Sequence, residues 1–175
     1  AENPAELSFF QRRKLNQLAD KYAVSSEDKT DAEIVGQLLL RVDPVPPSMA
    51  LAQAAIESAW GTSRFAVQGN NLFGQWCYRK GCGMVPLGRD AGRQHEVAKF
   101  STVSESVESY IRNINTHRSY RDLRANRARL RGGENSASGY QLAESLLEYS
   151  ELREKYVREV QAVIRINNLA RFDKL

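Results

Sequence analysis

The sequence predicts a mainly α-helical domain with one small β excursion, and three observations support this prediction. Apolar residues recur at helical spacing over most of the chain. Capping residues and proline breaks divide the periodic stretches into separate helices. Residues 69–95 interrupt the pattern, because they are rich in glycine, contain both cysteines and have few periodic apolar positions. That interruption predicts loops and short strands.

The bulk composition fits a single globular domain. The chain has 175 residues, of which 42% are hydrophobic and 26% charged, and this argues against disorder. We expect one domain over residues 1–175. It divides into N-terminal helices (1–46), a central helix (47–68), a loop and β lobe (69–100) and C-terminal helices (101–175).

Two helices are expected before the central one. The first begins at a cap, a first-turn proline and a capping-box acid within residues 3–6. The second begins at Thr30 or Asp31, and the proline-rich stretch 43–47 ends it. Both carry an apolar face at helical spacing.

The central helix contains a carboxylate in an otherwise apolar stretch. Ser48 is expected to cap this helix, which ends near Gly61. Gln53, Glu57 and Trp60 lie at i, i+4 and i+7 and so share one face. The helix C-terminus and partial burial beside the indole both raise the pKa of the Glu57 carboxyl. A carboxylic acid kept protonated suits a general acid, although spacing alone equally describes a salt-bridged or surface glutamate.

The rest of the chain returns to helices after one strand. Residues 96–100 are the best strand candidate and end a hairpin. Helical periodicity resumes over 103–114. Ser138 begins a further helix through a capping box with Gln141. The last helix carries an apolar face between residues 152 and 166.

The charge pattern narrows the partners only slightly. The formal net charge is +4, which favours acidic partners without selecting one. Five arginines recur at spacings of three and four on one helix face: Arg118, Arg121, Arg124, Arg127 and Arg131. We expect a solvated helix surface there, with an anion-binding stripe as the alternative. No helix-turn-helix, zinc finger or aromatic RNA-binding motif is present, so no nucleic-acid partner is expected.

The cysteine spacing argues against a redox motif and a metal site, and the lengths of the apolar runs argue against a membrane-spanning segment. Cys77 and Cys82 have four residues between them, which excludes a CxxC motif, and His95 and His117 show no metal-ligand spacing with them. A disulfide and two free buried thiols both stay open. We expect no metal and no cofactor. No apolar run approaches the roughly 20 residues that span a bilayer, and residues 1–7 do not resemble a signal peptide.

Two motifs carry a resemblance to a known family. The stretch "LAQAAIESAWGTSRFA" (51–66), followed by "NNLFG" (70–74), resembles the glucosaminidase domain family of cell-wall hydrolases. That family has a Glu-Ser-x-Trp-Gly helix end followed by Asn-Leu-Phe-Gly. The stretches "NNLFGQWCYRKGCGMVP" and "SYIRNINTHRSYRDLR" are more specifically similar to its Bax-like bacterial branch. The resemblance runs from about Pro47 through the last helix.

The resemblance implies a fold, an activity and two site residues. It implies a lysozyme-like helical fold with a small β-hairpin lobe, in which 47–68 is the catalytic helix. It implies an endo-β-N-acetylglucosaminidase that cleaves the β-1,4 bond after N-acetylglucosamine in peptidoglycan, with Glu57 as the general acid. A late tyrosine also belongs to the family's site. Tyr156 is favoured for that role, with Tyr149 and then Tyr140 as alternatives.

A second carboxylate is expected in the β lobe. The family places it ahead of a strand resembling residues 98–100, which favours Glu96, with Asp90 as the alternative. It would hold a water for inverting hydrolysis, or be dispensable if the substrate's 2-acetamido oxygen acts as the nucleophile. Sugar rings pack on aromatic faces and bind polar side chains. The substrate-binding candidates are Trp60, Asn71, Phe73, Trp76 and Tyr149, with Tyr78 and Asn70 as further possibilities.

Two other functions compete with this hypothesis. A lytic transglycosylase shares the lysozyme-like scaffold and a helix-borne acid, and a non-catalytic module would bind glycan without cleaving it. The expected partner is the glycan strand of peptidoglycan, and the expected state is a monomer. That substrate places the protein in the periplasm or cell envelope, with any signal peptide outside this chain.

Overall fold

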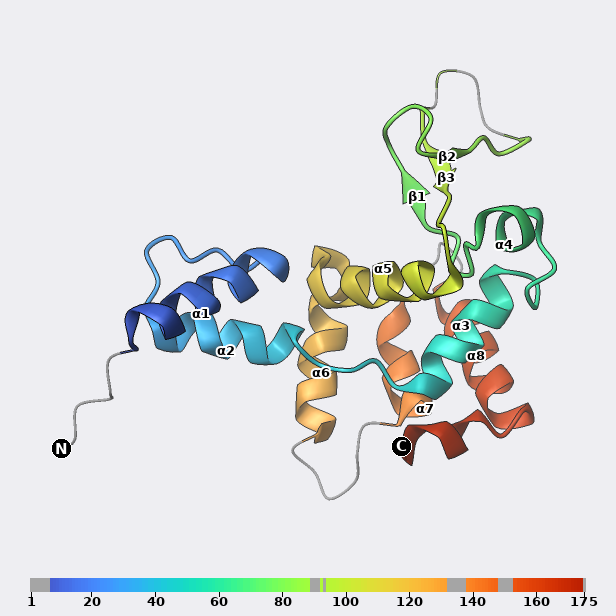
Figure 1. Ribbon diagram of the computed structural model, residues 1–175. Helices are drawn as coiled ribbons and strands as arrows, with labels where there is room; N and C mark the ends of the chain where they lie inside the picture. The colour runs from blue at the N-terminus through green and yellow to red at the C-terminus, as the bar shows by residue number, and fades with distance from the viewer. Residues whose placement is uncertain (1–6, 89–91, 93, 132–137, 148–152, 175) are drawn as a thin grey trace.

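The computed structural model describes residues 7–88, 92, 94–131, 138–147 and 153–174 (Figure 1). Helices form the body of the molecule, and a small sheet projects from it beside the start of α5. The predicted mainly α fold with a small β lobe is therefore confirmed. The longer helices are α1 (Phe9–Lys21), α2 (Asp31–Arg41), α3 (Pro47–Glu57), α5 (Val103–Thr116), α6 (Arg121–Arg131) and α8 (Glu154–Ile166). The shorter ones are α4 (Arg64–Gly69), η1 (Arg118–Tyr120), α7 (Gly139–Leu142), η2 (Ala143–Leu146) and η3 (Leu169–Lys174).

The first two helices form a hairpin with a core of its own. Its buried residues are Leu15, Ala19, Val24, Ile34 and Leu38. The predicted start of the second helix at Thr30 or Asp31 is confirmed, because Thr30 caps α2 and forms a capping box with Glu33. The cap predicted at residues 3–6 lies outside the described residues, and α1 begins at a capping box between Ser8 and Gln11 instead. The hairpin extends to one side of the helical body (Figure 1).

Helix α3 is the central element of the body. It packs on α7, α8 and η3, and Met49 and Ala52 on it are fully buried. The predicted Ser48 cap is wrong, because α3 already starts at Pro47 and Ser48 lies within its first turn. Ser48 instead donates from its backbone N (2.9 Å) and its Oγ (2.7 Å) to the carboxylate of Asp173. This pair ties the last helical turn of the chain to the start of α3.

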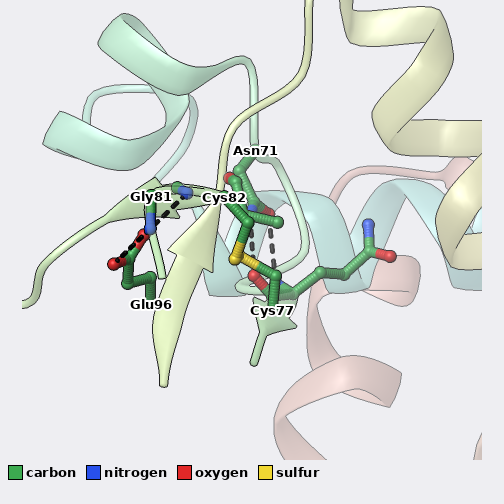
Figure 2. The surroundings of a disulfide bond; sticks show 8 residues. Asn71, Cys77, Gly81, Cys82 and Glu96 are labelled. Carbon is green, nitrogen blue, oxygen red and sulfur yellow. Dashed lines mark hydrogen bonds between the residues drawn. A yellow bond between two sulfur atoms is a disulfide. The ribbon is translucent and has the colours of Figure 1, made fainter. Parts of the chain in front are cut away.

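The β lobe is a three-stranded antiparallel sheet in the order β1-β3-β2. Its strands are β1 (Trp76–Cys77), β2 (Gly83–Met84) and β3 (Glu96–Ala98), so the strand predicted from residue 96 is confirmed for three residues. A disulfide joins Cys77 to Cys82 across the β1–β2 connection (Figure 2). A Cβ on Gly83 would collide with the backbone of Val97, so only glycine allows this close strand approach.

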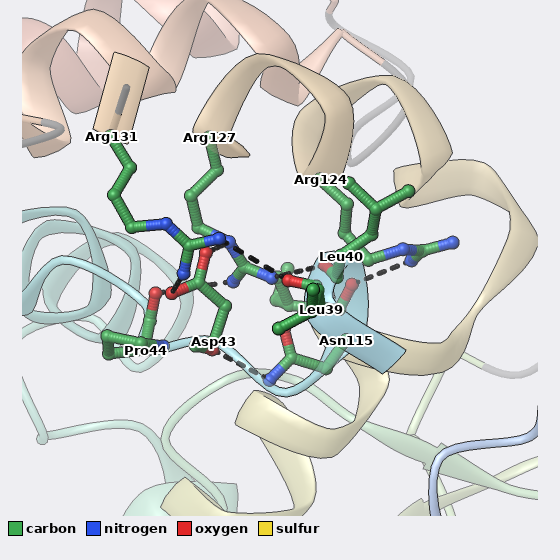
Figure 3. A network of polar contacts seen from close by, with 9 residues as sticks. Leu39, Leu40, Asp43, Pro44, Asn115, Arg124, Arg127 and Arg131 are labelled. Atoms are coloured by element: carbon green, nitrogen blue, oxygen red, sulfur yellow. Dashed lines mark hydrogen bonds and ion pairs between the residues drawn. The ribbon is translucent and has the colours of Figure 1, made fainter. Parts of the chain in front are cut away.

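The arginine-rich helix α6 turns part of its basic face inward (Figure 3). The prediction of a solvated surface is wrong for Arg124 and Arg127, whereas the Arg121 side chain is 84% exposed. Arg124 and Arg127 are only 4% and 2% exposed. Arg124 donates to the carbonyls of Ile114 and His117 at the end of α5, both at 2.9 Å. A repeat of three and four identifies a helix face, but it does not tell whether the face meets water or the ends of other helices.

The same face neutralises an acidic residue that precedes α3. Asp43 is buried and forms ion pairs with Arg127 at 3.0 Å, although not in hydrogen-bond geometry, and with Arg131 at 2.7 Å. Arg127 also donates to the carbonyls of Leu40 (3.0 Å) and Pro44 (3.3 Å). Guanidinium groups thus satisfy carbonyls that the end of α2 leaves unpaired. The network fixes the linker that delivers α3.

No helix in the described part of the chain is long and apolar enough to cross a membrane.

Candidate active site

A cleft of about 720 Å³ lies between the helical body and the β lobe, and Glu57 lines it. One side comes from Phe73, Gly74, Gln75, Trp76 and Tyr78, which lead into and out of β1. The other side comes from Ser109, Arg112, Asn113 and Thr116 on one face of α5, followed by His117, Ser119 and Tyr120. A smaller hollow of about 360 Å³ over α1 contains none of the predicted site residues.

Glu57 is the last residue of α3. The chain then reverses, because Ala59 and Trp60 both adopt positive φ angles, of 50° and 59°. Helical spacing therefore links Gln53 to Glu57 but does not extend to Trp60. The predicted role of Trp60 beside the acid is not what the structure shows, since its side chain is 65% exposed and lies outside the cleft lining.

Gly74 brings the loop backbone against the acid. Its φ of +62° favours glycine, and a Cβ there would lie 3.5 Å from Oε2 of Glu57. Asn71 builds the turn that leads to it. Its Nδ2 donates to the carbonyls of Gln75 and Ala98, and its Oδ1 accepts from the amides of Phe73 and Gln75. At 1% exposure Asn71 shapes the loop and does not face a substrate, which corrects its predicted binding role.

A series of buried hydrogen bonds leads from the core to Glu57. Phe73 stacks on Tyr110 with ring centroids 4.0 Å apart, so it mainly anchors the loop to the core. The Tyr110 hydroxyl donates to Oε1 of Gln53 at 2.7 Å. Nε2 of Gln53 then donates to the Tyr156 hydroxyl oxygen at 3.1 Å. This leaves the Tyr156 proton directed at Glu57, with which Tyr156 forms a side-chain hydrogen bond.

The surroundings of Glu57 act on its protonation in opposite directions. Burial raises the pKa of its carboxyl, the hydrogen bond from Tyr156 lowers it, and the charge of Glu159 raises it again. The net effect is a raised pKa. Burial and the Glu57 charge also raise the pKa of Tyr156 far above its ordinary value, so Tyr156 stays a protonated donor. The structure thus brings the predicted pair Glu57 and Tyr156 together.

Tyr120 is a second tyrosine near the acid, and the sequence reading did not single it out. Burial, followed by the charge of Glu57, raises the pKa of Tyr120 to about 12, while a hydrogen bond with Asn113 lowers it. Its only signal in the sequence is the segment "THRSYRDLR", which carries the family resemblance without marking this residue. The sequence also did not mark Gln53 and Tyr110 as site residues, because their roles depend on partners far along the chain.

The aromatic candidates divide between the cleft and other places. Trp76 is 55% exposed, lines the cleft and stacks on His95 with centroids 4.2 Å apart, and Tyr78 lines the same wall. Tyr140 lies on α7, outside the cleft lining. The candidates Tyr149 and Asp90 lie outside the described residues.

Glu96 belongs to the β lobe and not to the cleft lining. Its two carboxylate oxygens accept hydrogen bonds from the amides of Gly81 (2.9 Å) and Gly83 (2.8 Å), as Figure 2 shows. These bonds hold the β1–β2 connection to β3, so the geometry gives Glu96 a structural task. Its predicted catalytic role stays a prediction. Cys77 and Cys82 lie within reach of Glu96. Both sulfurs form the disulfide, so this trio does not form a metal site.

Among the described residues that line the cleft, Glu57 is the only carboxylate. The site therefore offers one acid with a raised pKa, a tyrosine that donates to it, and polar and aromatic groups along an open groove. That arrangement suits protonation of a glycosidic oxygen in a bound sugar chain.

Comparison with known proteins identifies relatives of the chain. The model of the glucosaminidase family, described as mannosyl-glycoprotein endo-β-N-acetylglucosaminidase, matches residues 35–169. "Protein bax" of Escherichia coli (strain K12) is 35% identical over 165 residues, which is 94% of this chain and 57% of the relative. "Exo-glucosaminidase LytG" of Bacillus subtilis (strain 168) is 35% identical over 80 residues, which is 42% of this chain and 28% of the relative.

A solved structure supports the fold. The catalytic domain of the autolysin Auto from Listeria monocytogenes aligns with a TM-score of 0.52 at 18% sequence identity, over 96% of this chain and 90% of that one. The chain therefore spans only part of the length of these two relatives, with matches that cover 57% of Protein bax and 28% of LytG. The division of residues 1–175 into one domain with four parts stays a prediction.

Proposed function

The chain belongs to the glucosaminidase family, and we propose that it is a peptidoglycan hydrolase that cleaves the β-1,4 bond after N-acetylglucosamine, with Glu57 as its general acid. The observation that carries this proposal is the position of Glu57. It ends α3 and lines the cleft, and burial raises the pKa of its carboxyl. A carboxyl that keeps its proton to higher pH is available to donate it to a leaving oxygen.

The proposed first step breaks the bond between the anomeric carbon and the bridging oxygen. Glu57 gives its proton to that oxygen, so the leaving sugar departs as a neutral alcohol. Glu57 is then a carboxylate, and the hydrogen bond from Tyr156 stabilises it in that form. Tyr156 serves as a fixed donor throughout, because burial keeps its phenol protonated.

The proposed nucleophile belongs to the substrate. Glu57 is the only carboxylate among the described residues of the cleft lining, and Glu96 is engaged with backbone amides. A substrate-assisted route needs no second carboxylate, because the 2-acetamido oxygen attacks the anomeric carbon and forms a cyclic cation as the leaving oxygen departs. Water then opens this cation and gives its proton to the Glu57 carboxylate, which restores the acid. Tyr120 and Asn113, hydrogen-bonded to each other beside Glu57, are suitably polar to orient that acetamido group.

A lytic transglycosylase is the second candidate, and the same single acid favours it. In that reaction a hydroxyl of the sugar itself attacks the anomeric carbon, so a protein base for water is not required. The two reactions differ in their products. Hydrolysis after N-acetylglucosamine leaves N-acetylglucosamine reducing ends, whereas transglycosylation leaves anhydro-muramic ends.

Product analysis on defined peptidoglycan tests the proposal. We expect the wild type to release fragments with N-acetylglucosamine reducing ends, identified by mass spectrometry. Glu57→Gln should remain folded and lose about 10²–10⁴-fold in rate, the usual contribution of a general acid. Anhydro-muramic ends would identify the transglycosylase. Saturable binding with no products would identify a glycan-binding module, and unchanged activity in Glu57→Gln would remove Glu57 from the mechanism.

The proposed substrate also suggests a location. Peptidoglycan lies outside the cytoplasmic membrane, so we place the protein in the periplasm or cell envelope. The Cys77–Cys82 disulfide supports this proposal, because such bonds persist in oxidising compartments.

A further inference from the structure

Arg112 gives the cleft a single permanent positive charge. Among the described residues that line the cleft, it is the only arginine, and no lysine accompanies it. Its guanidinium makes no ion pair or side-chain hydrogen bond to any described residue, although Glu108 lies one turn before it on α5. The arginines of α6 differ, since Arg124, Arg127 and Arg131 all bind carbonyls or Asp43. The exposed guanidinium of Arg112 is therefore not neutralised by any residue in the part of the chain that the structure describes.

Arg112 lies on the wall of the cleft that α5 forms. It follows Ser109 by three residues and precedes Thr116 by four, so it belongs to the α5 face that lines the groove. The next residue, Asn113, is hydrogen-bonded with Tyr120, whose own protonation responds to the charge of Glu57. A group that contacts Arg112 thus lies on the same helix face as the groups beside the acid.

The chemistry of a free guanidinium selects the ligand. Its planar fork of donors matches a carboxylate through two parallel hydrogen bonds, whereas a neutral hydroxyl uses only one and gains nothing from the charge. An uncharged polymer of N-acetylglucosamine offers no such partner. A peptidoglycan strand offers two kinds of carboxylate: the lactyl group of the muramyl sugar, which is free when the peptide is absent, and the carboxylates of the stem peptide.

We propose that Arg112 forms an anion subsite that binds a carboxylate of the glycan strand in the same cleft as Glu57. The proposal rests on the proposed function and narrows its substrate class. Carboxylate-bearing strands are preferred over uncharged chitin-like strands because of this one side chain. A partner carboxylate at Arg112 also fixes which way along the groove the strand lies.

The test measures binding separately from turnover. In the Glu57→Gln background, isothermal titration calorimetry compares three tetrasaccharides: the uncharged N-acetylglucosamine tetramer, a peptide-free muramyl tetrasaccharide with its free lactyl carboxylate, and the same sugar carrying stem peptides. We expect a carboxylate-bearing ligand to bind about tenfold more tightly than the uncharged one. Arg112→Gln should abolish that difference without weakening the uncharged ligand, and Arg112→Lys should restore part of it.

The matched control is Arg121→Gln, because the Arg121 side chain is 84% exposed on α6 and pairs only with its neighbour Asp122. It should keep the full preference. Preference for the peptide-free sugar assigns the lactyl group as the ligand, and preference only for the peptide-bearing sugar assigns the stem peptide. Equal binding of all three ligands, or a preference that survives Arg112→Gln, would overturn the proposal. Failure of the wild type to cleave any strand would instead reject the proposed function, since the binding comparison does not depend on turnover.

Discussion

Gln53 donates from Nε2 to the hydroxyl oxygen of Tyr156 at 3.1 Å, while its Oε1 accepts from Tyr110 at 2.7 Å. Because both ends of the amide are engaged, Gln53 cannot flip without losing two buried hydrogen bonds. The Tyr156 oxygen is therefore occupied as an acceptor, and its proton remains for Glu57. Gln53 is thus a positioning residue that acts on the acid through Tyr156.

Removing the hydrogen bond from Tyr156 to Glu57 should change the pH dependence of catalysis. The Tyr156 hydrogen bond lowers the pKa of Glu57, so Tyr156→Phe should raise it and shift the basic limb of the kcat/KM profile upward. An upward shift is expected because the charged carboxylate loses a hydrogen bond that favours it over the protonated form. Gln53→Met should shift the limb in the same direction but less, and add no shift in the Tyr156→Phe background. An equal additional shift in that background would show that Gln53 does not act through Tyr156.

Glu57 should cost the protein stability at neutral pH. Its raised pKa means that the native state keeps this proton to higher pH than the unfolded state, whose carboxyl titrates near 4.5. Stability is therefore lost as pH rises through the window above 4.5. Glu57→Gln lacks this loss, so its Tm should exceed that of the wild type at neutral pH, and the two should converge in acid below that window. Thermal melts across the pH range measure this, and a constant gap at every pH would contradict it.

Glu96→Gln should keep most of the activity. General acid–base groups contribute about 10²–10⁴-fold in rate, so a loss below about tenfold excludes that role. Gln retains one acceptor for the amides of Gly81 and Gly83, which should preserve the lobe in part. Glu57→Gln, assayed in parallel, supplies the scale. A loss at Glu96 as large as at Glu57, with rescue by azide, would restore Glu96 as a catalytic carboxylate.

Asp43→Asn should destabilise the fold by about 3 kcal/mol, because it leaves the buried charge of Arg127 without its counter-ion. Asp122→Asn is the control, since Asp122 pairs with Arg121 in full contact with solvent, and it should change stability by less than about 1 kcal/mol. Urea unfolding at neutral pH measures both variants. Similar small changes in the two variants would mean that the buried network contributes little.

The sequence predicts what depends on local pattern. Periodicity places most helices, Thr30 caps the start of α2, and Glu57 and Tyr156 meet in a side-chain hydrogen bond. The failures concern contacts between distant residues. Ser48 binds Asp173, which lies 125 residues away, and Gln53 binds Tyr156 across 103 residues. No local pattern records such a pairing.

The prediction of a solvated surface for Arg124 and Arg127 on α6 was wrong for a related reason. Arg124 and Arg127 repeat as surface residues do, but the carbonyl ends of α2 and α5 meet them there. Glu96 shows the same limit in the β lobe, because a carboxylate before a strand equally serves a reaction or a turn. The structural role became visible only with the hydrogen bonds from the amides of Gly81 and Gly83.

The arrangement of α6 bears on how the protein behaves as a polyelectrolyte. Its formal charge of +4 counts every arginine alike, yet Arg124 and Arg127 present almost nothing to the solvent. A cation-exchange resin or a polyanion meets only the outer charges. We therefore expect this protein to elute from heparin and sulfonate columns at lower salt than a protein of equal formal charge whose arginines are all exposed.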